Sequence, residues 1–234
     1  MPMGLLGNAV VAIWNDILPE ARSDFVEWHN REHIPERVAI TGFRRGRRYF
    51  SDRGVPEYFT LYEAEEERTL TSPEYLERLN SPTPWTRRAT SAFRNTLRGI
   101  CRVVFSNGCG DGGFMLTLRF DALPERAGAL ERHLVTTALP PLAEIEGVSG
   151  VHLCIADQSA SNIDTTERRN KQVDVPHWIT LIEGSRPDAV EKASDVLLAG
   201  EPERHGAVGP FARGLYTLEI CRVKTAPLVL ASRG

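Results

Sequence analysis

The chain has 234 residues, of which 41% are hydrophobic and 25% charged, and its formal net charge is -3. These values are typical of an ordinary globular protein and argue against a general nucleic-acid-binding role. No apolar run approaches the roughly 20 residues that a membrane-spanning helix needs, so we expect a cytoplasmic protein with no membrane partner. The cysteines lack any paired metal or redox spacing, which predicts reduced, mostly buried thiols and no structural metal; they are Cys101, Cys109, Cys154 and Cys221.

The first half of the chain matches the second half at an offset of 105 residues, and turn residues match as well as apolar ones. Asp16 aligns with Asp121, Pro35 with Pro140 and Gly42 with Gly147. Later segments align at offsets of 115 and 120 residues. This repetition predicts a fold built from two equivalent units.

The first unit opens with a strand and a helix. Residues 8–14 are an apolar run of strand length. A helix is expected next, because Phe25 and Trp28 fall on one helical face. Pro35 disfavours helical torsion angles in the residue before it, so we predict that the helix ends or kinks near His33.

The rest of the unit adds two strands, a helix and a final strand. Residues 43–50 have strand character and residues 57–63 alternate between apolar and polar side chains. A second helix is expected to begin around residue 72, and residues 100–105 close the unit as a strand. The order is βαββαβ, and residues 114–120 open its second copy.

A four-stranded antiparallel sheet with both helices on one face leaves its other face uncovered. Two such sheets can bury these faces against each other. The sequence therefore predicts an α+β fold in which two tandem units, residues 1–108 and 109–234, form one intramolecular barrel. The glycine-rich residues 108–113 are expected to be the joint between the units.

The offset grows from 105 to 120 residues because the second unit carries a polar insertion at residues 157–171. So polar a segment is expected to be a long exposed hairpin loop. It is either an insertion without a role or a lid over a pocket.

The strongest local signal is Trp-His-Asn-Arg-Glu-His-Ile-Pro at residues 28–35. His29 and His33 lie four apart on one helical face, and Glu32 lies close enough to converge with both. One interpretation is the His-x-x-Glu-His motif of zinc peptidases, which the helix end disfavours. A second makes His33 a general acid or base, with Glu32 and the helix terminus favouring its imidazolium form. A third is a solvated helix face on which His33 caps carbonyl groups.

This run, followed by Gly42-Phe43 and a strand that ends near Tyr49, resembles the EthD-like branch of the dimeric α+β barrel superfamily. The resemblance covers residues 7–105 well and residues 113–223 only as a fold. It implies ferredoxin-like units that pair into a barrel, often as homodimers and sometimes fused in tandem. The superfamily includes cofactor-free monooxygenases, dehydratases, decarboxylases, isomerases and haem enzymes, so the fold alone does not name the reaction.

Differences between the two halves favour a single site in the first. His29 aligns with Leu134 and His33 with Ala138, whereas the flanking proline and glycine persist. We therefore predict that His33 is the catalytic acid or base and that Glu32 and His29 orient and tune it.

Arginines and a tyrosine of the second strand are expected to hold an anionic substrate group. Alternation places Arg45, Arg47 and Tyr49 on one face of the strand. A guanidinium there could neutralise a carboxylate or a developing enolate, so Arg47 with Tyr49 is the predicted pair.

Aromatic residues supply the remaining candidates for substrate binding. Tyr58 and Tyr62 share a face of the third strand, either as core residues or with a hydroxyl group in the pocket. Trp28 would shape the pocket together with Trp85, which lies in a rigid loop at residues 82–87 or else merely covers the core.

Haem is disfavoured, because His29 and His33 flank a charged surface and not an apolar slot. We expect a cofactor-free small-molecule enzyme that performs proton transfer, as a lyase, dehydratase or isomerase, on an aromatic or polyketide-like acid. A homodimer is a further expectation. The alternative is a non-catalytic ligand-binding or stress-associated barrel or, less favoured, a haem-binding or monooxygenase relative.

Overall fold

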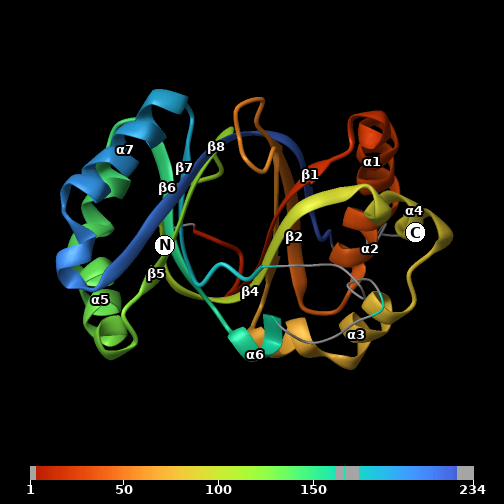
Figure 1. Ribbon diagram of the computed structural model, residues 1–234, viewed down its shortest axis with the longest axis horizontal. Helices are drawn as coiled ribbons and strands as arrows, with labels where there is room; N and C mark the ends of the chain where they lie inside the picture. Colours follow the sequence, from red (N-terminus) through yellow and green to blue (C-terminus); the bar gives the residue numbers. More distant parts are fainter. Residues whose placement is uncertain (1–3, 162–165, 167–173, 226–234) are drawn as a thin grey trace, which may run out of the picture.

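The computed structural model describes residues 4–161, 166 and 174–225. In this part of the chain, eight strands form a closed antiparallel barrel in the order β1-β3-β2-β8-β5-β7-β6-β4 (Figure 1). The strands are β1 (Ala9–Ile17), β2 (Phe43–Phe50), β3 (Tyr58–Ala64), β4 (Phe93–Gly108), β5 (Phe114–Ala122), β6 (Val148–Ala156), β7 (Trp178–Gly184) and β8 (Ala207–Val223). Two tandem ferredoxin-like units thus form one intramolecular barrel, as predicted.

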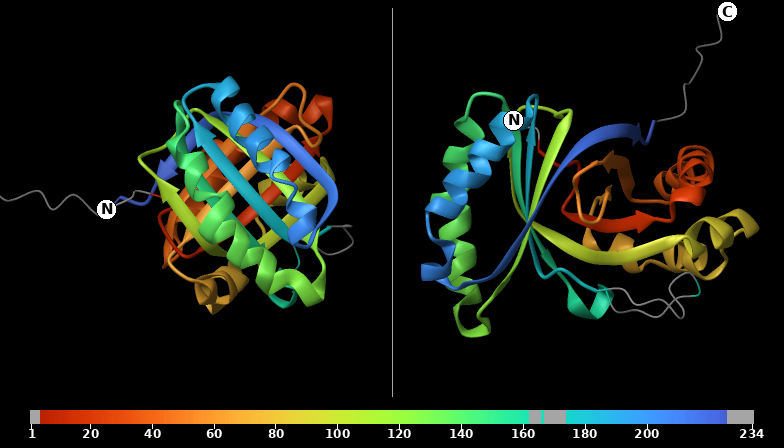
Figure 2. Two further views of the ribbon diagram at one scale, coloured as in Figure 1. Left: turned by 90° about the vertical axis from the view of Figure 1, so that its left-hand side faces the viewer. Right: turned by 45° about the horizontal axis from the view of Figure 1, so that its top comes forward.

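The two longest strands join the units. β4 pairs with β1 of its own unit and with β6 of the other, whereas β8 pairs with β5 and with β2. Each crosses from one sheet into the other, as the right-hand view of Figure 2 shows. Because the ladder closes, the barrel strands leave no open sheet edge. β4 begins at Phe93, well before the strand start predicted at residue 100, because its first half pairs with β1 and only its second half crosses to β6.

Helices cover the outer face of each sheet, so the barrel lies between two helical layers (Figures 1 and 2). The first unit contributes η1 (Pro19–Ala21), α1 (Arg22–Trp28), η2 (His29–His33), α2 (Ile34–Ala39), η3 (Glu67–Thr71), α3 (Pro73–Asn80) and α4 (Pro84–Ser91). The second contributes η4 (Pro124–Arg126), α5 (Ala127–His133), η5 (Leu134–Ala138), η6 (Pro140–Glu144), α6 (Gln158–Ser161), α7 (Pro187–Ala199) and η7 (Pro202–His205). No helix of the described residues is long and apolar enough to cross a membrane.

Of the two outcomes predicted near His33, a helix end or a kink, the helix end is wrong. The helix passes through a π-helical turn, η2, and continues as α2 to Ala39. Pro35 lies in the first turn of α2, where its missing N–H interrupts the α-helical pattern and a wider π turn absorbs the change. The same π turn recurs 105 residues later as η5, so it belongs to the architecture of both units.

A second correction concerns residues 82–87, which were expected to form a rigid loop. They include the start of helix α4. Thr83 caps this helix by accepting a hydrogen bond from the backbone N–H of Thr86 at 3.0 Å. The cap and the proline after it are a helix-start signal that the sequence interpretation overlooked.

Aromatic and aliphatic side chains fill the middle of the barrel. Trp14, Tyr49, Phe59, Leu61 and Tyr216 are all fully buried there. The barrel is therefore a packed core between the two sheets, and further apolar clusters lie between each sheet and its helices.

The insertion at residues 157–171 lies largely outside the described residues, and so does the lid proposed for it. Its described start forms α6, where the Ser161 hydroxyl accepts a hydrogen bond from the Ile100 backbone N–H at 2.9 Å. The expectation of mostly buried thiols holds for two cysteines. Cys101 and Cys154 are buried, whereas Cys109 and Cys221 are exposed.

Candidate active site in the first unit

The two histidines lie in the layer between the helices and the outer face of the first sheet. His29 and His33 project from the π turn η2 and are only 4% and 6% exposed. The Trp28 ring lies tilted against that of His33 with ring centroids 4.3 Å apart, and the two histidine rings stack with centroids 5.5 Å apart. We call His29, His33, Trp28, Arg48 and Tyr62 the histidine cluster.

Hydrogen bonds determine which ring nitrogen of His29 carries the hydrogen. Its Nε2 lies 3.1 Å from the Tyr62 hydroxyl, and a guanidinium nitrogen of Arg48 lies 3.3 Å from its Nδ1. An arginine can only donate, so Nδ1 accepts and Nε2 carries the hydrogen. His29 is therefore neutral and oriented from both sides, which suits a residue that positions its neighbours.

His33 differs, because its Nδ1 is buried without a hydrogen-bond partner. Burial lowers the pKa of both histidines well below 6.5, and Arg48 near His29 and Arg37 near both lower it further. Both rings are therefore neutral near pH 7. This corrects the imidazolium expected at a helix end, since the turn lies within a continuous helix and under a protein layer.

Glu32 does not converge with the histidines. Its carboxylate accepts hydrogen bonds from the hydroxyl groups of Thr83 and Thr86 at 2.6 and 3.1 Å, at the start of α4. The zinc-peptidase arrangement is therefore not formed, and the described residues contain no group of three or more potential metal ligands of the His, Cys, Asp and Glu types.

The other predicted aromatic residues brace the helical layer. The Trp28 indole donates to Thr86 at 3.2 Å, and the Trp85 indole donates to Asp24 at 3.0 Å, which ties α4 to α1. Tyr58 packs edge-on against Phe25. Trp85 thus links two helices, and of the two tyrosines Tyr62 is the one that reaches the histidines.

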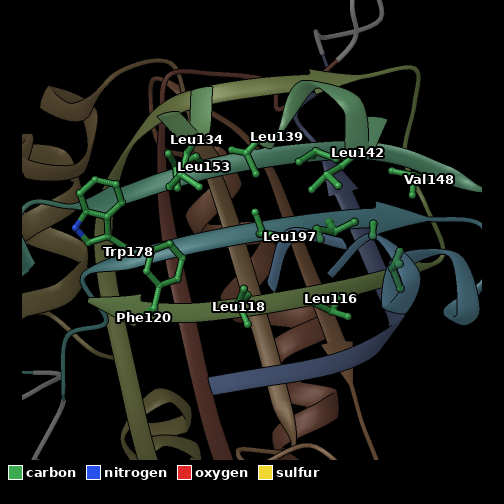
Figure 3. Close-up of a cluster of buried hydrophobic side chains, with 14 of the residues drawn as sticks. Leu116, Leu118, Phe120, Leu134, Leu139, Leu142, Val148, Leu153, Trp178 and Leu197 are labelled. Atoms are coloured by element: carbon green, nitrogen blue, oxygen red, sulfur yellow. The ribbon is translucent and has the colours of Figure 1, made fainter. Parts of the chain in front are cut away.

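The second unit replaces the polar members of this layer with apolar residues. The equivalent residues are Leu134 for His29, Ala138 for His33, Leu142 for Arg37, Leu153 for Arg48 and Ile182 for Tyr62. They belong to the apolar core or pack against it between the second sheet and its helices, and Figure 3 shows Leu134, Leu142 and Leu153 within that core. The fold can therefore be built without the histidine cluster.

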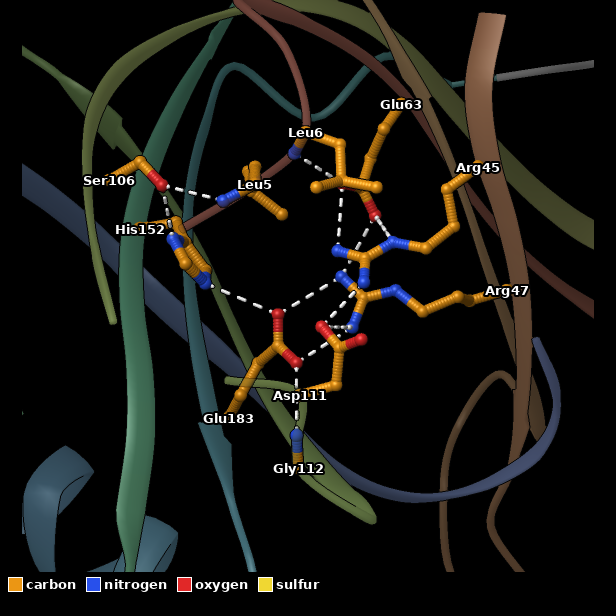
Figure 4. A network of polar contacts seen from close by, with 10 residues as sticks. All are labelled: Leu5, Leu6, Arg45, Arg47, Glu63, Ser106, Asp111, Gly112, His152 and Glu183. Carbon is orange, nitrogen blue, oxygen red and sulfur yellow. Dashed lines mark hydrogen bonds and ion pairs between the residues drawn. The ribbon is translucent and has the colours of Figure 1, made fainter. Parts of the chain in front are cut away.

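Arg47 and Tyr49 lie on the opposite face of the sheet, inside the barrel. Arg47 makes a bidentate contact with Glu183 at 2.7 and 3.0 Å and lies 3.0 Å from Glu63 (Figure 4). The structure therefore separates the predicted anion-binding pair, Arg47 and Tyr49, from the predicted catalytic histidines. Alternate residues of β2 point to opposite faces of the sheet, and the histidines lie on the other face. Arg47 is already neutralised by two carboxylates, so it is not free to hold a substrate anion.

Arg47 belongs to a charged cluster that closes one end of the barrel, formed by Arg45, Arg47, Glu63, Asp111 and Glu183 (Figure 4). Burial opposes ionisation of Glu183, but Arg47 and a hydrogen bond from His152 hold its pKa well below the usual range. Sequence interpretation missed both glutamates. A feature of the sequence could have identified them. Glu63 and Glu183 align at the offset of 120 residues, and each is the only charged residue in an otherwise apolar strand segment.

A pocket of about 600 Å³ opens at the other end of the barrel. Its wall includes Pro56, Leu97, Arg119, Asp174 and Pro210, from five separate segments. None of the predicted site residues lines it. The sequence feature that could have indicated this pocket is Arg119. It is a cation at one of the alternating positions of β5 that face the barrel interior.

No protein-family model matches the sequence, and no curated protein matches it. Solved structures do resemble it. A candidate monooxygenase from Fusobacterium nucleatum superposes with a TM-score of 0.62 at 8% identity, covering 94% of this chain and 96% of the other. An anthrone oxidase-like protein gives a TM-score of 0.62 at 12% identity, covering 95% of each chain. A haem-binding protein from Thermus thermophilus gives 0.51 at 14% identity, covering 94% of each. At such identities the likeness shows the fold alone, which is that of the dimeric α+β barrel proteins.

Proposed function

We propose that the chain is a small-molecule enzyme in which neutral His33 acts as a general base in the histidine cluster of the first unit. The observation that carries the proposal is the buried Nδ1 of His33, which has no hydrogen-bond partner and lies beside Trp28 and His29. A neutral imidazole with a free ring nitrogen is ready to accept a proton.

The cost of this arrangement supports a function over a structural role. A buried polar atom left unpaired costs about 1–3 kcal/mol. The second unit avoids this cost with Ala138 at the equivalent position and still forms the same π turn. The π turn therefore does not require an imidazole at position 33, and selection for chemistry is a reason for its presence.

The surroundings suggest the kind of substrate. The buried rings of Trp28 and Phe25 make the cluster aromatic, and the Arg48 guanidinium lies 5.6 Å from the centre of the Phe25 ring. We propose an aromatic or polyketide-like acid with an activated C–H bond. His33 would take the proton and leave a carbanion or enolate, and the Tyr62 hydroxyl with the Arg48 charge would favour that anion.

Haem does not fit this cluster. Both ring nitrogens of His29 are engaged, and Trp28 covers His33 with ring centroids 4.3 Å apart. The earlier reason against haem, a charged surface around the histidines, is wrong because both are buried among aromatic rings. Proton transfer by the protein's own residues therefore fits better than haem chemistry. The rival proposal is a non-catalytic barrel that only binds a ligand.

Anthrone is a suitable first probe, because its methylene group is acidic and one structural neighbour is anthrone oxidase-like. Exchange of its methylene hydrogens for deuterium would be followed by NMR under argon. We expect the protein to accelerate exchange and His33→Ala to lose at least ~100-fold of that acceleration. His133→Ala, which removes an imidazole from the second unit, is the matched control and should exchange normally.

Thermal unfolding of the same variants separates catalysis from a structural role. His33→Ala should lose little thermal stability, because removal of an unpaired buried atom offsets the cost of the cavity that the ring leaves. Equal exchange by the parent and His33→Ala would contradict the proposal. Tight anthrone binding without exchange would favour the ligand-binding alternative, and consumption of oxygen in air would identify a monooxygenase instead of a lyase or isomerase.

A further inference from the structure

Arg119 is a buried cation without a counterion at the base of the mouth pocket, the pocket at the end of the barrel away from the charged cluster. Its side chain lies inside the barrel and is 8% exposed, and its Nε has no hydrogen-bond partner. Within the described residues it forms no ion pair, although every other buried arginine in the barrel interior does. A buried charge left unpaired costs several kcal/mol. Such a group is expected to have a partner that comes from outside the chain.

The guanidinium is held so that its edge is available. Its central carbon lies 4.9 Å from the centre of the Trp14 ring. Trp14 is itself fixed, because its indole N–H donates to the Thr117 hydroxyl at 3.3 Å. Stacking occupies one face of the guanidinium and leaves its N–H groups, which point outward in the plane, free to donate.

Backbone hydrogen bonds hold the walls of the mouth pocket in place. The Asp174 carbonyl accepts from the Arg98 backbone N–H at 2.9 Å, and the Asp174 N–H donates to the Thr96 carbonyl at 3.2 Å. The Tyr216 hydroxyl donates to the Pro56 carbonyl at 2.9 Å, which ties the loop between β2 and β3 to the barrel. The pocket is therefore preformed, and its volume lies within the range of small-molecule sites.

The charges and the lining select a class of ligand. Asp121 and Asp174 also line the pocket and disfavour a dianion such as phosphate, and the His177 ring contacts Asp121 at 2.7 Å. Prolines and aliphatic residues make up much of the rest, including Pro56, Leu97 and Pro176. One guanidinium can bind a planar carboxylate through two parallel hydrogen bonds.

We infer that the mouth pocket is a second binding site, in which Arg119 pairs with the carboxylate of a small acid whose apolar body contacts the proline-rich wall. It lies inside the barrel, on the opposite face of the sheets from the histidine cluster. The inference does not depend on the proposed catalytic role of His33.

Calorimetric titration with 2-naphthoate tests it, with 2-naphthalenemethanol and inorganic phosphate as comparison ligands. We expect 2-naphthoate to bind the parent protein and to lose at least ~10-fold in affinity in Arg119→Met, because the ion pair is gone. Arg204→Met removes an exposed arginine that is not part of the pocket lining and should bind like the parent. The uncharged alcohol should bind weakly and equally to all three proteins, and phosphate should not compete.

Several results would overturn the assignment. They are equal 2-naphthoate affinity in Arg119→Met, no binding by the parent at millimolar concentration, or displacement by phosphate. Weaker binding in His33→Ala would place the acid in the histidine cluster and would also refute the mouth pocket. If Arg119→Met does not fold, Arg119→Gln keeps a polar side chain without the charge and carries the same expectations.

Discussion

Arg119 and Trp14 occupy equivalent positions in the two repeated units, and their side chains stack on each other with 4.9 Å between the guanidinium carbon and the ring centre. Residues at one position of the repeat can meet in this way because the two sheets face each other across the barrel. The units have diverged at this position into a cation and an aromatic ring that complement each other.

This stacking should appear as an energetic coupling. In a double-mutant cycle with Trp14→Leu and Arg119→Met, we expect the two changes to interact by about 0.5–2 kcal/mol, as a partly desolvated cation–π pair does. Denaturant unfolding of the four proteins measures it. A coupling near zero would show that the contact contributes nothing to stability.

The charged cluster should depend strongly on Arg47. Replacing it with leucine leaves Glu63 and Glu183 buried without their shared cation, so we expect a loss of about 3–5 kcal/mol in the free energy of unfolding. Arg44→Leu is the matched control on the same strand, because Arg44 pairs with Glu65 at the exposed surface. It should cost less than about 1 kcal/mol. Similar losses for the two variants would refute the buried network.

The hydrogen bond between His29 and Tyr62 gives a third prediction. Tyr62→Phe should destabilise the protein by about 1–3 kcal/mol, since the Nε2–H of His29 loses its acceptor. His29→Leu combined with Tyr62→Ile copies Leu134 and Ile182 of the second unit and should recover most of that loss. If the double variant is less stable than Tyr62→Phe alone, the two units do not share interchangeable packing at this position.

The free energy of unfolding should decrease as the pH is lowered, because of the two buried histidines. Their folded-state pKa values lie well below 6.5 because of burial. Below about pH 6.5 the unfolded chain therefore binds protons that the folded chain does not, and each histidine then costs up to about 1.4 kcal/mol per pH unit. Unfolding free energies from about pH 7 to pH 5 measure this slope. His29→Leu combined with His33→Ala should flatten it, and an unchanged slope would contradict the assignment.

The thiols should divide into two classes. Burial raises the pKa of Cys101 to about 12 and that of Cys154 well above its usual value. Cys109 and Cys221 are exposed, although partial burial of the Cys221 thiol also raises its pKa. A disulfide reagent near pH 8 should modify two thiols in the folded protein and all four after unfolding. Rapid modification of more than two would show that the barrel interior opens readily.

The sequence predicted the order and spacing of the strands and helices well, but it did not predict which way the polar side chains point. The repeat offsets were correct to the residue, since β1 and β5 begin 105 residues apart and β3 and β7 begin 120 apart. The helix end that was one of two outcomes predicted near His33 does not occur, because a π turn is formed by the balance of hydrogen bonds around Pro35 and has no compositional signal of its own. Glu32 was wrongly joined to the histidines for the same reason, since spacing in a regular helix does not describe a π turn.

The sequence by itself determined the architecture. Apolar periodicity, prolines and glycines specify strands, helices and turns locally, and the same pattern occurs in both units of this chain. Tertiary structure alone decided which polar groups meet. Glu63 and Glu183 lie far apart in the chain and both reach Arg47 only because the barrel closes. Closure also left Arg119 without a counterion, and the packing of the helical layer left His33 with a free nitrogen, since whether a buried polar group is paired depends on every element packed around it.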